Sequence, residues 1–511
     1  MSKSLLCPCE DVTASEVDHC IDKGYRDIES VKRFTGFGTG MCQGKQCLTA
    51  VARHLELRTK NAPEQIVPFT PRPPLFPTEL SYWASASFDP AKAPAGGVPL
   101  PYPTASPQGA LPSMGFTVPA LKPKTQVPER AKIVIIGGGI MGLSLAWNLT
   151  EQGERDVVVI DKGYLCAGAS GRNGGGIRAQ WGTPTLISLA QRSIELMKRF
   201  ARDMGINVWF RQGGYLFLAK SEEVVKRIEK SAALHNKHGV PTQILTPDAA
   251  REIVPQLTMK GIKAAAWNPK DAVIFPWPFV WGYAQQVEKR GVKVETFTRV
   301  EGFELGGGPG ARRVTRVITD RGDIACDTVV LAAGAWSPQI AKLAGVHLPN
   351  QPHRHEICSS EPLKPFLGPL VSVLDTGLYF SQSMRGEIVG GMGDHHEPAG
   401  MNLGSTERFL TRYAQALTEQ IPQLGHLKVL RQWAGPYDVT PDNSPILGRT
   451  SELQNLIQMS GFVGHGFMMA PAVAERMAKW MASGESDELF ERFTLSRFAE
   501  GRMEREDMII G

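Results

Sequence analysis

The segment that most restricts how this chain folds is 131–161, in which two apolar runs flank a Gly-rich turn. The first run predicts a buried strand, and Gly137, Gly139 and Gly142 follow it at the start of a predicted helix. The second apolar run ends in Asp161. A strand, a glycine turn, a helix and a second strand with a terminal acid predict one βαβ unit of a parallel sheet.

The glycine spacing has a chemical reason. Gly137 permits the tight turn, Gly139 lets the backbone approach a pyrophosphate, and Gly142 lets helix and strand pack closely. The helix N-terminus faces the phosphates with a partial positive charge, and Asp161 accepts hydrogen bonds from a ribose. The motif therefore predicts a dinucleotide site for FAD or NAD, with a Gly-rich turn that binds no cofactor as the alternative.

A second small-residue loop, 168–178, comes soon after Asp161. Its glycines let the backbone lie against a flat ring system, which favours FAD over NAD. This loop and the blocks 329–337, 433–448 and 461–468 resemble the D-amino-acid oxidase/sarcosine oxidase superfamily. The resemblance is strongest to FAD-dependent amine dehydrogenases of the beta-subunit type, with heteromeric sarcosine oxidase, dye-linked proline dehydrogenase, opine oxidase and hydrogen cyanide synthase as relatives.

The resemblance implies an α/β FAD-binding domain, Rossmann-like and of the glutathione-reductase type, with an inserted antiparallel-sheet (α+β) substrate domain, all within 131–500. We expect FAD-binding parts at 131–205, 291–350 and 430–485, and substrate parts at 206–290 and 351–429. The implied FAD contacts are Gly137, Gly139, Ile140, Met141, Gly142, Asp161, Lys162, Ala169, Ser170, Arg172, Asn173, Gly174, Gly175, Val300, Ala333, Gly334, Trp336, Gly464, His465, Gly466, Phe467 and Met468.

The same resemblance assigns the substrate side. Arg178 is the candidate for binding a substrate carboxylate, because its planar fork pairs bidentately; an Arg held against FAD phosphates or another acid is the alternative. The backbone of 464–468 is expected at a helix N-terminus near the flavin, where negative charge develops on reduction. His465 faces the flavin or makes a structural hydrogen bond. Tyr379 and Tyr437 border the substrate or are simply buried aromatics.

Three positions and one stretch depart from the family pattern. Gly435 stands where monomeric sarcosine oxidase has its flavin-attaching cysteine, which excludes that thioether, and Met468 replaces a substrate-binding lysine. The stretch 379–394 contains no lysine to activate oxygen, which favours a dehydrogenase. Lys270 replaces the histidine that carries FMN in the heteromeric enzyme, so covalent FMN is not expected, whereas noncovalent FMN at a subunit interface stays open.

Five of the eight cysteines fall within the first 47 residues. Cys7, Cys9, Cys42 and Cys47 stand in a context that resembles the bacterioferritin-associated-ferredoxin domain, which implies a small helical [2Fe-2S] domain over 1–60. Zinc is the alternative, because four cysteines also satisfy that ion. The fifth, Cys20, is expected in a helix core.

Residues 61–130 are Pro-rich, with 16 of the 37 prolines between 62 and 130, and predict an extended linker or strap. Apolar side chains within it are costly to leave in water, which favours packing along a domain or a partner subunit over free disorder. They are Phe69, Leu75, Phe76, Leu80, Tyr82, Trp83 and Phe88.

The net charge of +5 comes without a dense basic block, so no nucleic-acid partner is expected. No apolar run is long enough to span a membrane, and no secretory signal opens the chain, which predicts a cytoplasmic protein.

We therefore expect an FAD-dependent dehydrogenase that oxidises the C–N bond of a small-molecule amine: an amino or imino acid or secondary amine such as sarcosine, glycine, a proline-like or D-amino acid, or an opine. Electrons would leave through the cluster to an unspecified acceptor, in a complex with a second, alpha-type flavoprotein subunit. A hydroxy-acid or polyol dehydrogenase, and a non-catalytic electron-relay subunit, are the alternatives.

Overall fold

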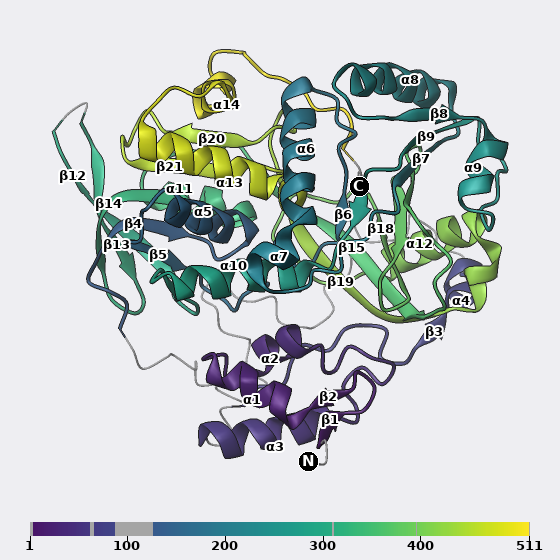
Figure 1. Ribbon diagram of the computed structural model, residues 1–511, viewed down its shortest axis with the longest axis horizontal. Helices are drawn as coiled ribbons and strands as arrows, with labels where there is room; N and C mark the ends of the chain where they lie inside the picture. The colour runs from purple at the N-terminus through teal and green to yellow at the C-terminus, as the bar shows by residue number, and fades with distance from the viewer. Residues whose placement is uncertain (1–3, 62–65, 87–125, 309–310, 395, 510–511) are drawn as a thin grey trace.

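The computed structural model describes residues 4–61, 66–86, 126–308, 311–394 and 396–509. They form two large sheets side by side, with a small helical domain beneath them (Figure 1). The two-sheet α/β architecture expected from the sequence is confirmed.

The first sheet has eight strands in the order β11-β5-β4-β14, after which β14 pairs with both β13 and β21. Strands β4 and β5 pair in parallel and are almost wholly buried, because helices cover this sheet. The strands are β4 (Arg130–Ile136), β5 (Val157–Ile160), β11 (Lys293–Glu295), β12 (Val300–Gly306), β13 (Arg313–Thr319), β14 (Ile324–Leu331), β20 (Ile446–Arg449) and β21 (Leu456–Ser460).

Helix α5 packs against α10 and α13 beside this sheet, and α13 also packs against α6 (Figure 1). The helices of this half are α5 (Ile140–Glu151), α6 (Pro184–Lys198), α7 (Phe200–Met204), α10 (Pro276–Lys289), α11 (Ser337–Leu343), α13 (Gly466–Ser483) and α14 (Glu488–Arg492), with short turns η2 (Ala169–Gly171), η3 (Gly334–Trp336) and η5 (Leu495–Phe498).

The second sheet has nine strands, in the order β3-β19-β15-β18-β17-β16-β7-β9-β8. All its pairs are antiparallel except β16 with β7. The strands are β3 (Thr78–Glu79), β7 (Tyr215–Ala219), β8 (Gln243–Leu245), β9 (Ala264–Asn268), β15 (Gln351–Pro362), β16 (Leu370–Val373), β17 (Leu378–Gln382), β18 (Glu387–Met392) and β19 (Lys428–Val439). Around them lie α4 (Leu80–Ser85), α8 (Glu222–Lys237), α9 (Pro247–Ile253), α12 (Glu407–Gln420) and η4 (Pro422–His426), and a short ladder joins β6 (Gly176–Ile177) to β10 (Ala272–Val273).

Two elements pack in the other half of the protein from the one expected for their residue ranges. Helix α10 falls within the expected substrate part 206–290, but it packs against α5 of the FAD half. Strand β19 falls mostly within the expected FAD part 430–485, but it pairs with β15 in the nine-stranded sheet. The chain therefore crosses between the halves at other points than the sequence indicated.

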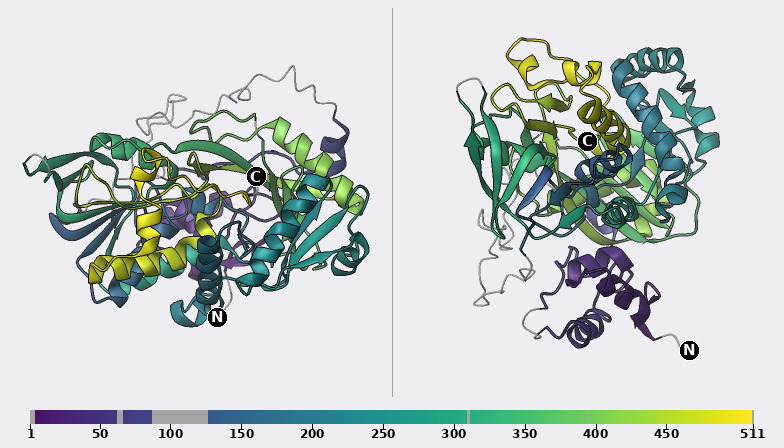
Figure 2. Two further views of the ribbon diagram at one scale, coloured as in Figure 1. Left: turned by 90° about the horizontal axis from the view of Figure 1, so that it is seen from above. Right: turned by 60° about the vertical axis from the view of Figure 1, so that its left-hand side comes forward.

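The N-terminal domain contains β1 (Leu5–Cys7), β2 (Val12–Thr13), α1 (Ala14–Asp22), α2 (Ile28–Thr35) and α3 (Leu48–Thr59). Figure 2 shows it projecting from one side of the body. It docks through Tyr25 and Phe34, whose rings meet the edge of Trp281 on α10 at 4.1 and 5.2 Å between centroids. Helix α2 ends at Gly36, whose φ of 83° suits glycine.

Residues 66–86 of the Pro-rich region pack on both the N-terminal domain and the two-sheet body. Phe69 is buried against Phe37 of the N-terminal domain, with ring centroids 5.7 Å apart. Strand β3 then pairs with β19, and α4 packs against α12. Phe88 and most of the expected strap lie outside the described residues. None of the described helices is long and apolar enough to cross a membrane.

Candidate active site

The Gly-rich turn lies between β4 and the turn that follows β14. Gly137 has a φ of 119°, and a Cβ there would collide with the carbonyl of Ala332. A Cβ on Gly142 would collide with the carbonyl oxygen of Gly137 and lie 3.0 Å from Ile135. These glycines are required by close backbone packing.

The N-cap residue of α5 is Gly139, which has no side chain to cap the helix. Ser170 from the next loop supplies a hydroxyl instead, because Ile140 N–H donates to Ser170 Oγ at 3.0 Å. The Asp161 carboxylate accepts hydrogen bonds from the N–H groups of Gly138 and Gly163, each at 2.8 Å. Burial raises the pKa of Asp161.

The other expected cofactor contacts gather at this edge of the sheet. Lys162 Nζ lies 4.1 Å from the centroid of the Trp336 ring, in the turn η3 that also contains Gly334 and follows Ala333. Met141 lies in the first turn of α5, and Ala169 opens η2. Val300 lies further out, at the start of β12, two residues after Thr298, whose N–H donates to the Asp161 carbonyl at 2.7 Å.

The loop 168–178 is fixed against β19. Arg172 Nη1 donates to the Ala434 carbonyl at 2.9 Å, and Trp433 Nε1 donates to the Arg172 carbonyl at 2.8 Å. Asn173 Oδ1 accepts from Gly175 N–H at 2.8 Å, and a Cβ on Gly174 would lie 3.5 Å from Tyr379. The loop therefore connects the dinucleotide turn to the nine-stranded sheet.

This arrangement fits FAD. A pyrophosphate would lie at the N-terminus of α5, beside a glycine turn in which an added Cβ at Gly137 or Gly142 would collide with backbone. Segment 464–468 supplies a second helix N-terminus, because α13 begins at Gly466. The side chains of Phe467 and Met468 point into the core, so that only the backbone of these two residues is offered to a cofactor.

Arg178 lies deep in the site, 2% exposed, with its guanidinium 3.6 Å from the centroid of the Trp181 ring. It donates hydrogen bonds to the carbonyl oxygens of Gln180 and Met508. Burial lowers the pKa of Arg178. Neither of these acceptors is an acid, although the nearby charges of Glu506 and Asp271 partly offset the effect of burial on the pKa of Arg178.

His465 also packs against Trp181, with ring centroids 4.9 Å apart. It is 1% exposed, and neither of its ring nitrogens has a hydrogen-bond partner among the described residues. Burial and the nearby charge of Arg178 lower the pKa of His465 to about 3, so its ring is neutral. Tyr437 packs directly on Gly464, where a Cβ would lie 2.5 Å from the tyrosine Cζ.

The two candidate tyrosines meet through a residue that the sequence interpretation missed. His355 on β15 stacks between Tyr437 and Tyr379, with centroids 4.5 and 5.6 Å away, and its Nε2 lies 2.9 Å from Tyr379 Oη. Strand alternation places His355 on the face of the sheet shared by both tyrosines. Trp181 was missed as well; its position three residues after Arg178 was the available signal.

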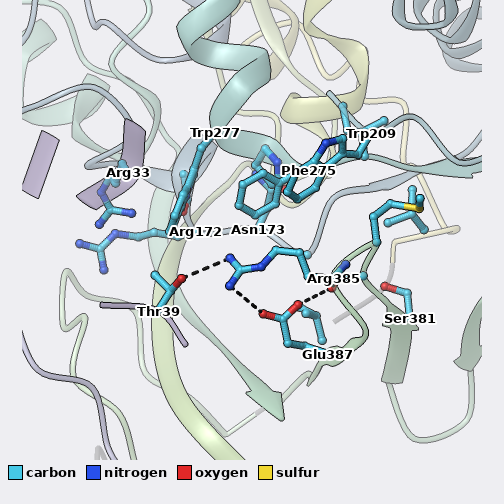
Figure 3. A pocket seen from close by; sticks show the side chains of 18 of the residues that line it. Arg33, Thr39, Arg172, Asn173, Trp209, Phe275, Trp277, Ser381, Arg385 and Glu387 are labelled. Carbon is cyan, nitrogen blue, oxygen red and sulfur yellow. Dashed lines mark hydrogen bonds and ion pairs between the residues drawn. The ribbon is translucent and has the colours of Figure 1, made fainter. Parts of the chain in front are cut away.

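A cationic cavity opens between the N-terminal domain and the body, with an empty volume of about 1020 Å³ that includes open solvent (Figure 3). Arg385 joins the N-terminal domain to the two-sheet body there. It pairs with Glu387 of the body and Glu10 of the N-terminal domain, and it donates to Thr39 Oγ1 of that domain at 3.2 Å. The cations that line the cavity are Lys32, Arg33, Arg72, Arg172, Arg211, Arg385 and Arg431, and its aromatic lining comes from Trp209, Phe275, Trp277 and Trp433.

The candidate metal ligands lie in the N-terminal domain. The four thiols shift one another's pKa: Cys7 and Cys47 interact directly, as do Cys9 and Cys42, and charge also couples Cys9 to Cys7 and Cys47 to Cys42. A hydrogen bond with Cys47 lowers the pKa of Cys7 to about 6. Within the described ranges, no group of three or more His, Cys, Asp or Glu side chains is arranged to hold a metal ion. Cys20 is buried in the core of the domain.

Residues 132–480 match the family model of the FAD dependent oxidoreductases. The match covers more than half of the chain, and the chain belongs to this family of FAD-binding enzymes.

A second family model, the sarcosine oxidase A3 domain, matches residues 1–87. This corrects the expected bacterioferritin-associated-ferredoxin domain over 1–60. The match runs past residue 60 into the strap, consistent with the burial of Phe69 against Phe37.

Individual relatives cover the same region. The chain is 30% identical over 388 residues to sarcosine oxidase subunit beta of Rhodobacter capsulatus, across 75% of this chain and 92% of that protein. It is 29% identical to mitochondrial dimethylglycine dehydrogenase of Rattus norvegicus, across 70% of this chain and 43% of that protein. The crystal structure of L-proline dehydrogenase from P. horikoshii is 36% identical, with a TM-score of 0.70, across 74% of this chain and 100% of that one.

Proposed function

We propose that this protein oxidises the C–N bond of an amine that carries a carboxylate, with FAD as the hydride acceptor. The observation that carries the proposal is the buried group formed by Arg178, Trp181 and His465 beside the Tyr379–His355–Tyr437 stack. The names of the relatives support it, because sarcosine, dimethylglycine and proline are all amines with a carboxylate.

The residues have distinct parts in this mechanism. Bound FAD supplies the acceptor for a hydride from the C–H next to the amine nitrogen. Arg178 binds the carboxylate and fixes the orientation of that C–H bond. The stacked rings of Tyr379, His355 and Tyr437 form a wall that excludes water. The N-terminus of α13 would offer its partial positive charge to the flavin ring, and His465 stays neutral near Arg178.

Substrate class is tested by turnover with an artificial dye as electron acceptor. Sarcosine, N,N-dimethylglycine, glycine, L-proline, a D-amino acid and an opine are compared with glycolate and L-lactate at equal concentration. We expect turnover with at least one amine and none with the hydroxy acids. Turnover of the hydroxy acids alone would instead identify a hydroxy-acid dehydrogenase.

The absence of a lysine from 379–394 supports a dehydrogenase over an oxidase. We expect dye reduction to exceed oxygen consumption with the same amine. Oxygen consumption at the same rate as dye reduction would contradict this.

We also propose a [2Fe-2S] cluster on Cys7, Cys9, Cys42 and Cys47. Four mutually interacting thiols supply the number of ligands that a [2Fe-2S] cluster takes, and one tetrahedral zinc ion is the alternative. Metal analysis and visible absorption test this: iron and its absorption should be lost in Cys42→Ser and kept in Cys20→Ser. Stoichiometric zinc without iron would refute the cluster.

The protein works with a second, alpha-type subunit in this proposal. The name of the Rhodobacter capsulatus relative is that of a subunit, and Leu75, Phe76 and Tyr82 of the strap are 63–71% exposed. The cationic cavity supports a second flavin, because seven cations and four aromatic rings suit the phosphate and ring system of noncovalent FMN. Protein isolated from its own cells should contain a second polypeptide and release FMN as well as FAD; a single polypeptide with FAD alone would contradict both.

A further inference from the structure

The segment 499–509 returns from η5 to the candidate active site. Figure 1 shows the C-terminal part of the chain running back into the middle of the body, and Met508 packs in one core cluster with residues of β7, β9 and β16. Glu506 is 0% exposed and Met508 is 3% exposed, although the segment belongs to no helix or strand. Such burial of irregular backbone requires specific partners for its polar groups.

Glu504 anchors the start of the buried part. Its carboxylate pairs with Arg492, whose Nε lies 2.6 Å from Oε2. Its carbonyl oxygen accepts from Ser444 Oγ at 2.8 Å. Two residues later, Glu506 N–H donates to the Asp442 carbonyl at 3.2 Å.

The Glu506 side chain ties the segment to the loop that contains Arg178. Its two carboxylate oxygens accept from Gly182 N–H at 2.9 and 3.1 Å. One of them also accepts from Met508 N–H at 2.7 Å. A Cβ on Gly182 would lie 2.7 Å from this carboxylate, so the fit is close.

Met508 completes the wall of the site. Its side chain packs in a core cluster with Tyr215, Phe217 and Leu370, and Tyr379 packs against the same cluster. Its carbonyl oxygen accepts the hydrogen bond from Arg178 Nη2. Half of the guanidinium fork that would receive a substrate carboxylate is therefore taken by this segment.

A carbonyl is the weaker partner for a buried cation. A carboxylate brings a compensating charge and accepts two parallel hydrogen bonds from one guanidinium, whereas a carbonyl brings no charge. A ligand shifts a conformational equilibrium by its difference in affinity for the two states. A carboxylate therefore favours a state in which Arg178 has left Met508.

We propose that residues 504–509 are a displaceable wall of the substrate site: the Met508 carbonyl holds Arg178 when no substrate is bound and gives way to the substrate carboxylate. The proposal rests on the assignment of Arg178 to the carboxylate. It makes this segment a determinant of specificity, because an amine without a carboxylate has nothing with which to displace it.

Hydrogen exchange of the FAD-bound full chain tests the displacement directly. Pyrrole-2-carboxylate and pyrrole serve as matched probes with and without the carboxylate, and perturbation of the flavin absorption reports their binding. We expect pyrrole-2-carboxylate to increase amide exchange across 504–509, and pyrrole to leave it unchanged. Because no variant is needed, the result does not depend on whether a mutant folds.

A variant pair then measures the coupling. Glu506→Ala removes the anchor on Gly182, while Glu500→Ala removes an exposed acid of the same segment that pairs with Arg502. We expect Glu506→Ala to bind pyrrole-2-carboxylate about tenfold more tightly, since less interaction has to be broken and the acid near Arg178 is gone, and pyrrole as before. Glu500→Ala should match the unaltered protein for both probes.

Two outcomes separate this inference from the function on which it rests. Binding of pyrrole-2-carboxylate with unchanged exchange across 504–509, or weaker binding by Glu506→Ala, overturns the displacement while amine oxidation stands. If no amine is oxidised and neither probe perturbs the flavin in any variant, both the assignment of Arg178 and the displacement fail.

Discussion

Two buried histidines each contribute a loss of stability as the pH falls. Burial lowers the pKa of His235 and of His355 to about 4, whereas an unfolded chain protonates histidine near pH 6.5. Stability that is present above pH 6.5 is therefore lost as the pH falls through about 4, on the order of 3 kcal/mol for each group. Urea unfolding between pH 7 and 4 measures this. His235→Gln should give a shallower dependence on pH, and His426→Gln, whose side chain is 91% exposed, should not.

The hydrogen bond between His355 and Tyr379 is a second test at the residue scale. Tyr379→Phe keeps the stacked ring but removes the hydroxyl that lies 2.9 Å from His355 Nε2. A buried polar atom left without its partner costs about 1–3 kcal/mol of unfolding free energy. The matched change Tyr82→Phe, on an exposed side chain, should stay within about 0.5 kcal/mol. Equal effects in the two variants would mean that the hydrogen bond between His355 and Tyr379 does not stabilise the fold.

The sequence predicted the role of a residue where that role depends on neighbours close in the chain. The glycines of the turn and Asp161 follow from short-range spacing within one βαβ unit. The partner of Arg178 was not predictable, because Met508 lies 330 positions away and contributes a backbone carbonyl that no side-chain motif encodes. His355 was equally hidden, because only the pairing of β15 with β19 brings it beside Tyr437.

At the scale of elements, the contact between β4 and α5 depends on Gly142. In Gly142→Ala the new methyl collides with the Gly137 carbonyl, so helix and strand separate and the phosphate site is distorted. We expect the ratio of bound FAD to protein to fall severalfold, measured from the visible and ultraviolet absorption of the purified protein. Gly302→Ala is the control, since a Cβ there lies no closer than 3.7 Å to any neighbour. Full FAD content in Gly142→Ala would contradict this account of the turn.

The crossing points between the two halves show what the sequence could not indicate at this scale. Both α10 and β19 have clear local patterns, but a pattern does not say which sheet an element joins. Helix α10 joins the FAD half because its buried face packs on α5 and receives the N-terminal domain through Trp281. The start of α13 at Gly466 was accessible to sequence reasoning, because a helical run follows the glycine-rich turn.

At the scale of the molecule, the strap connects the N-terminal domain to the far edge of the nine-stranded sheet. Leu80 of α4 is 1% exposed and lies in the core cluster beneath α12, whereas Tyr82 of the same helix is 63% exposed. Leu80→Ala should lower the unfolding free energy by about 2–5 kcal/mol in urea titration. Tyr82→Ala should change it by about 0.5 kcal/mol or less. If the two variants were equally stable, the strap would not be part of the core.

The cationic cavity also belongs to this scale, because the N-terminal domain, the strap and the body all contribute to its lining. No segment of the sequence contains enough of it to stand out, since its seven cations come from stretches spread between residues 32 and 431. The sequence could suggest a second flavin only through the family resemblance.

The central claim is that this chain itself oxidises an amine, and anaerobic mixing of the isolated FAD-bound chain with candidate amines tests it most directly. We predict that sarcosine, L-proline or another carboxylate-bearing amine of the panel bleaches the flavin absorption in the absence of any partner. The Arg178→Gln variant should require a much higher amine concentration for the same bleaching. A flavin that no amine bleaches in the isolated chain, but that is reduced once the complex is assembled, would contradict the claim and identify the chain as an electron relay.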